Sequence, residues 1–115
     1  MRENSWDYQP SAGYGGADLT GFKVEAVGGD IGKVDKHNSE VGAACLVVDT
    51  GPWIFGKEVL IPARAVTQID IEEEKVYLSL TKEQVKEAPE FHRESHYDSQ
   101  DYREQVSTHY WPQHV

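Results

Sequence analysis

The sequence is poor in cysteine, in positive charge and in long hydrophobic runs, and each shortage excludes a class of protein. The single cysteine, Cys45, excludes an internal disulfide. Eleven basic residues against twenty acidic ones give a formal net charge of −9, which disfavours nucleic acids and anionic membranes as partners. No apolar run approaches the roughly 18 residues of a spanning helix, and the first residues lack a signal-peptide core. We therefore expect a cytoplasmic protein.

Catalytic and metal-binding patterns are also missing. The glycine-rich stretches 13–16 and 28–29 lack the following helix and lysine of a phosphate-binding loop. His92 and His96 have the i, i+4 spacing of two zinc ligands, but a structural zinc needs four ligands, and neither HExxH nor a second cysteine is present. The carboxylates fall mostly in turns and tails. The sequence therefore predicts no enzyme, no cofactor and no metal site.

The sequence does contain a series of short apolar segments separated by turns. Segments 44–49 and 58–62 are long enough for strands and too short for helices. Apolar and polar residues alternate in the others, which favours half-buried strands; these segments are 22–26, 31–36, 66–71 and 76–80. Six short strands at intervals of about ten residues predict a mainly β fold, a small antiparallel barrel.

Two helical patterns follow the last strand. Thr81 and Gln84 have the spacing of a capping box, and Pro89 limits that helix to about 82–87. Further on, Tyr102, Val106 and Tyr110 recur at i, i+4 and i+8, as on one helix face. We expect a short helix after the last strand and a C-terminal tail that is extended or, over about 99–110, helical.

The chain divides into a patterned centre and two polar ends. Residues 1–17 show no period of 2 or 3.6 and are interpreted as an N-terminal arm without regular structure. Residues 18–89 hold the predicted strands and the short helix. Residues 90–115 form the C-terminal tail.

The order of these segments resembles the PRC-barrel family. The match runs over about 18–89 through a series in fixed order: Asp30-Ile31-Gly32-Lys33-Val34, Leu46-Val47-Val48-Asp49, Phe55-Gly56-Lys57-Glu58-Val59-Leu60-Ile61-Pro62, Ala65-Val66 and Val76-Tyr77-Leu78. The family includes the barrel of the photosynthetic reaction centre H subunit and that of a ribosome maturation factor. The resemblance implies a compact PRC-type barrel that binds other proteins without a general catalytic role, as in stand-alone bacterial barrel proteins.

Two groups of residues are candidates for an interface. Trp53, Ile54 and Phe55 lie between glycines; an exposed loop of this kind would anchor a protein partner, because aromatic residues dominate binding hot spots. The alternative is that their side chains fold back and fill the barrel end. The second group lies in the tail and would clasp a second protomer; the alternatives are packing on its own barrel and a mobile tail. Its members are Tyr97, Tyr102, Val106, Tyr110 and Trp111.

The sequence thus predicts a non-catalytic protein-interaction or assembly module that forms a homodimer or docks another protein through the aromatic loop and tail. Small domains often gain stability by association, which favours the homodimer. The alternative is a barrel that binds a small ligand in its mouth near Trp53. A concave pocket with convergent polar groups would favour that alternative.

Overall fold

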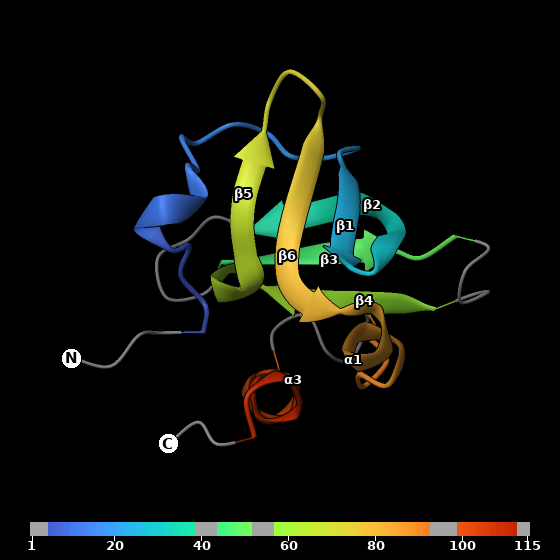
Figure 1. The fold of residues 1–115 in the computed structure, drawn as a ribbon. Helices are drawn as coiled ribbons and strands as arrows, with labels where there is room; N and C mark the ends of the chain where they lie inside the picture. Colours follow the sequence, from blue (N-terminus) through green and yellow to red (C-terminus); the bar gives the residue numbers. More distant parts are fainter. Residues whose placement is uncertain (1–4, 39–43, 52–56, 93–98, 113–115) are drawn as a thin grey trace.

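The computed structural model describes residues 5–38, 44–51, 57–92 and 99–112, and the statements below refer to these (Figure 1). The strands are β1 (Lys23–Val27), β2 (Gly29–Asn38), β3 (Cys45–Asp49), β4 (Glu58–Pro62), β5 (Val66–Asp70) and β6 (Lys75–Thr81). The helices are α1 (Lys82–Lys86) and α3 (Gln100–Tyr110), with 3-10 turns η1 (Pro10–Ala12) and η2 (Ala63–Ala65).

The strands form one open, mixed sheet in the order β4-β3-β2-β1-β6-β5. Neighbours pair antiparallel except β1 and β6, which are parallel. The predicted closed, antiparallel barrel is therefore wrong, whereas the mainly β class and six strands are confirmed. The reason lies at η2, where the chain turns a corner, so that β5 leaves β4 instead of pairing with it and β4 and β5 become the two edges.

The sheet bends strongly, so that its two halves enclose the core. Figure 1 shows β5 and β6 running upright while β3 and β4 cross behind and below them. The register of β2 shifts at Ile31 against β1 and at Asp35 against β3, and these shifts accompany the bend. This is expected because an extra residue in one strand increases local twist. β3 is buried on both faces, from Cys45 to Val48, which agrees with its continuous apolar sequence.

The helix starts follow the sequence signals. Thr81 Oγ1 accepts a hydrogen bond from the Gln84 amide at 3.0 Å, and Gln84 Oε1 accepts one from the Thr81 amide at 2.9 Å. This is the predicted capping box at the start of α1. Ser99 caps α3 through its side chain, which accepts from the Tyr102 amide at 3.1 Å. The tail is thus helical over Gln100–Tyr110.

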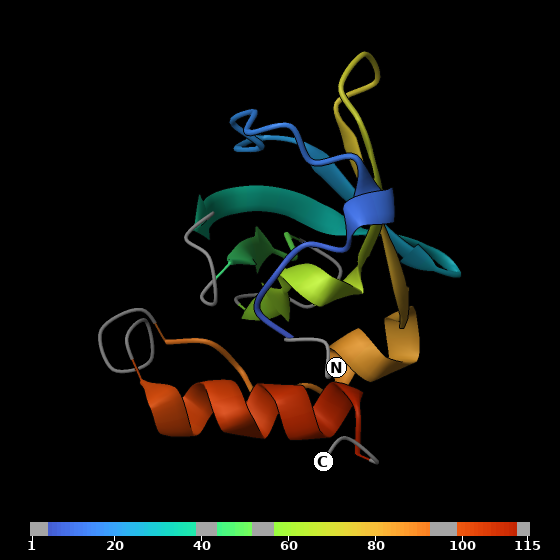
Figure 2. The ribbon, with the colours of Figure 1, turned by 90° about the vertical axis from the view of Figure 1, so that its left-hand side faces the viewer.

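Both chain ends pack on the sheet and cover its edges. The Phe91 amide donates to the Glu58 carbonyl on β4 at 3.0 Å, and η1 lies beside β5 (Figure 1). Figure 2 shows α3 running across the end of the molecule nearest β4. Trp6 and Ala12 of the arm belong to the same core as the sheet. Covered edges reduce strand-to-strand aggregation. The prediction of an arm without regular structure was wrong at η1, which is a 3-10 turn.

In the described ranges, no helix combines the length and the apolar character needed to cross a membrane.

Candidate binding site

The base of the loop between β3 and β4 is held by side-chain hydrogen bonds. Asp49 Oδ1 accepts from the Gly51 amide at 2.8 Å. The Thr50 hydroxyl donates to the Lys57 carbonyl at 2.6 Å, which ties the two strand ends together. Lys57 Nζ then donates to the carbonyls of Lys86 and Ala88 at 2.8 and 2.9 Å, at the end of α1. Both ends of the loop are therefore fixed to the scaffold.

The loop residues themselves, Trp53, Ile54 and Phe55, lie outside the described residues, and so does Tyr97. Their role in an interface stays a prediction.

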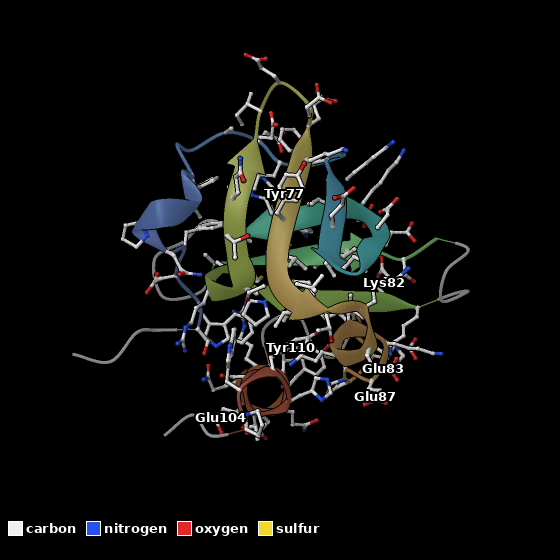
Figure 3. The ribbon with its side chains drawn as sticks, viewed as in Figure 1. Tyr77, Lys82, Glu83, Glu87, Glu104 and Tyr110 are labelled. Atoms are coloured by element: carbon white, nitrogen blue, oxygen red, sulfur yellow. The ribbon has the colours of Figure 1, made fainter. Side chains whose placement is uncertain are left out.

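The other tail residues lie in the chain's own core. Tyr102, Val106 and Tyr110 line the inner side of α3 and are 2, 0 and 2 % exposed. Figure 3 shows Tyr110 on the side of α3 toward the strands and Glu104 on the other side. Trp111 is half-buried, with the Arg64 guanidinium 5.1 Å from its ring centre. Of the roles considered for the tail, the structure places these residues in packing on their own sheet.

Tyr102 and Tyr110 differ in how their hydroxyls are satisfied. Tyr102 Oη donates to the Pro89 carbonyl at 2.9 Å, and its ring centre lies 5.9 Å from that of Phe91. Tyr110 Oη is buried and has no hydrogen-bond partner among the described residues. Burial raises the pKa of both phenols well above the usual value.

Arg103 and Ser107 connect α3 to the arm and to β3, and sequence reasoning missed both. The Arg103 guanidinium lies 4.7 Å above the Trp6 ring and 3.8 Å from Cys45 Sγ. Ser107 Oγ lies 2.8 Å from Ser5 Oγ, within hydrogen-bond distance. Their position in the sequence could have identified them. Each directly follows a residue of the predicted helix face, Tyr102 or Val106, and so widens that face.

A hollow of about 290 Å³ opens beside the loop base, on the solvent face of the sheet. Four charged side chains from three strands line it, namely Lys23, Asp30, Lys33 and Asp49. Sequence reasoning missed this hollow, because charged residues that alternate with apolar ones are typical of an ordinary solvated face.

Gly32 is required where β2 passes the loop base. A Cβ at this position would overlap the Asp49 carbonyl oxygen, and the Gly32 φ of 142° is disfavoured for other residues. The signal in the sequence was a glycine inside a strand pattern, which often marks close approach of another backbone.

Comparison with protein-family models and with curated proteins gives no match to this chain. Within the described part of the chain, no group of three or more histidine, cysteine or acidic side chains is arranged to hold a metal ion.

Proposed function

We propose that the protein is a non-catalytic binding module that docks a protein partner through the loop carrying Trp53, Ile54 and Phe55. The observation that supports this proposal most directly is the fixed base of that loop, held by Asp49, Thr50 and Lys57. Loops presented by a rigid scaffold are common binding elements. A fixed base reduces the ordering entropy that binding must overcome.

The rest of the described surface offers few large apolar side chains to a partner. Val27 and Ile71, 55 and 53 % exposed, are the exposed large hydrophobic residues in the described ranges, and they lie on different strands or turns. The aromatic residues of α3 are used in the core. The loop is therefore the strongest remaining candidate for an aromatic anchor. The resemblance to the PRC-barrel family, which implies protein binding, is part of the same proposal.

A second copy of the chain is the first partner to test. Size-exclusion chromatography with light scattering at high micromolar concentration should give a dimer for the wild type and a shift toward monomer for Trp53→Ala. Tyr77→Ala is the matched control, because Tyr77 is a half-buried aromatic residue elsewhere on the sheet (Figure 3). A wild-type chain that stays monomeric would exclude self-association. An equal shift in both variants would contradict a role for the loop.

Binding of a small ligand is the second candidate function. The hollow beside Gly51 favours it, because it is concave and four charged residues from three strands line it.

A further inference from the structure

Charged residues form a row across the solvent face of the sheet. The register pairs Lys75 with Lys23, Lys23 with Lys33, Lys33 with Asp49, and Asp49 with Glu58. Directly paired residues point to the same face, with Cβ atoms about 5 Å apart. The row therefore changes from positive to negative between β2 and β3.

The positive part of the row is incompletely paired. Lys75 lies 3.7 Å from Glu25. Lys23 and Lys33 are exposed, and within the described ranges neither ammonium forms a hydrogen bond or lies within salt-bridge distance of a carboxylate, although Asp49 is opposite Lys33 in the register. Two like charges directly opposite each other are destabilising, so these two lysines favour an added negative group between them.

The negative part of the row favours an added positive group. Asp49 and Glu58 are directly opposite across β3 and β4. Burial, followed by the Asp49 charge, raises the pKa of Glu58 above its usual value. Asp49 uses one oxygen to hold the loop base, and Asp30 likewise accepts from the Gly32 amide at 3.0 Å. Both residues line the hollow, where their carboxyl groups would favour a positive group.

We propose that this hollow binds a small zwitterion of the free amino acid class. Lys23 and Lys33 hold its carboxylate, and Asp49 faces its ammonium group. A simple anion would be repelled by Asp30 and Asp49, and a simple cation by the two lysines, so the lining discriminates against both. The volume of about 290 Å³ lies near the lower end of the range for small-molecule sites.

An NMR titration of the full ¹⁵N-labelled chain tests this site. The probes are the twenty amino acids, each at millimolar concentration. Acetate, phosphate and methylamine serve as controls that carry charge of one sign only. We expect saturable shifts of the Gly32, Lys33 and Gly51 amides with at least one amino acid. These controls should bind at least about tenfold more weakly than the amino acid, because each lacks one charge-assisted contact.

Three variants identify the groups that bind. Lys33→Gln should lower the affinity about tenfold or more, because it removes the charge from an exposed side chain. Asp49→Asn should weaken binding similarly while keeping an oxygen that accepts from the Gly51 amide. Glu104→Gln, which removes a charge on the exposed side of α3 away from the strands (Figure 3), should leave the affinity unchanged.

Three results would overturn the proposal: no shift with any amino acid, equal affinity for acetate or phosphate, or unchanged affinity in Lys33→Gln. The inference rests on the second candidate function, ligand binding in the hollow, and not on docking through the loop. Trp53→Ala should retain amino acid binding, and failure of the titration would leave the docking proposal intact.

Discussion

At the scale of single residues, Tyr102 and Tyr110 provide a matched pair. Both are 2 % exposed, yet only the Tyr102 hydroxyl has a hydrogen-bond partner among the described residues. Tyr102→Phe should lower the free energy of unfolding by about 0.5–1.5 kcal/mol. Tyr110→Phe should leave it unchanged or raise it, because a buried hydroxyl without a protein partner is removed. Urea unfolding monitored by circular dichroism measures both; the opposite order would contradict the assigned packing of α3.

Stability at high pH depends on the buried phenols. Burial raises the pKa of Tyr8, Tyr102 and Tyr110 well above 10, so the folded state favours the protonated form. This contribution is complete below about pH 10, the usual tyrosine pKa, and is lost as the pH rises above it. The urea midpoint should therefore fall steeply above about pH 10, and less steeply in Tyr110→Phe. An identical slope in the variant would argue against burial of this phenol.

Gly32 tests the close approach of β2 to the loop base. Gly32→Ala should cost about 3 kcal/mol or more, or prevent folding, because the new Cβ overlaps the Asp49 carbonyl and the backbone has a positive φ. Gly15→Ala is the control, since no atom lies within 4 Å of a Cβ there and its φ is not in the positive range. Thermal unfolding compares the two; equal melting temperatures would contradict the backbone geometry at Gly32.

At the scale of elements, the docking of α3 is testable through the single cysteine. Cys45 is 1 % exposed and lies against Arg103 of α3. Val106→Asp places a carboxylate at a fully buried position and should release α3. The rate of Cys45 labelling by a thiol reagent should then rise by at least about tenfold, as expected for a loss of local stability above 1.4 kcal/mol.

The control for this experiment is Gln105→Asp, which introduces the same group on the exposed side of α3. Labelling at the wild-type rate in Val106→Asp, or equal acceleration in both variants, would show that α3 does not protect Cys45.

The individual elements were largely predictable from local sequence, and their arrangement was not. Short apolar runs identified β3 and β4, alternation identified the other strands, and the Thr81–Gln84 spacing identified α1. The parallel pairing of β1 with β6 joins segments about fifty residues apart and has no local signature. The corner at η2 (Ala63–Ala65) is a local turn, but its effect on closure depends on the whole sheet.

At the scale of the whole molecule, the two chain ends complete the fold. Trp6, Ala12, Tyr102 and Tyr110 share one core with the strands. If the tail clasped a second protomer, removing residues 90–115 would turn a dimer into a monomer. From the structure we instead expect such a deletion to expose the apolar residues of β4 and destabilise the chain, visible as a lower melting temperature.

The candidate site was predictable only in part. The aromatic composition of 53–55 marks a possible anchor from sequence alone. The helix face formed by Tyr102, Val106 and Tyr110 was predicted from the sequence. Whether it packs on its own sheet or on a neighbouring chain depends on the tertiary path of the chain. The row of charged residues from Lys75 to Glu58 could not be predicted, because cross-strand register brings together residues that are far apart in sequence.

Docking of a protein through the aromatic loop is tested most directly by quantitative affinity capture from cells of the source organism, comparing wild type, Trp53→Ala and Tyr77→Ala. We predict that wild type and Tyr77→Ala retain the same defined set of proteins. Trp53→Ala should retain about tenfold less of them, as expected for loss of an aromatic hot spot. Capture of the same proteins in the same amounts by all three would contradict the proposal.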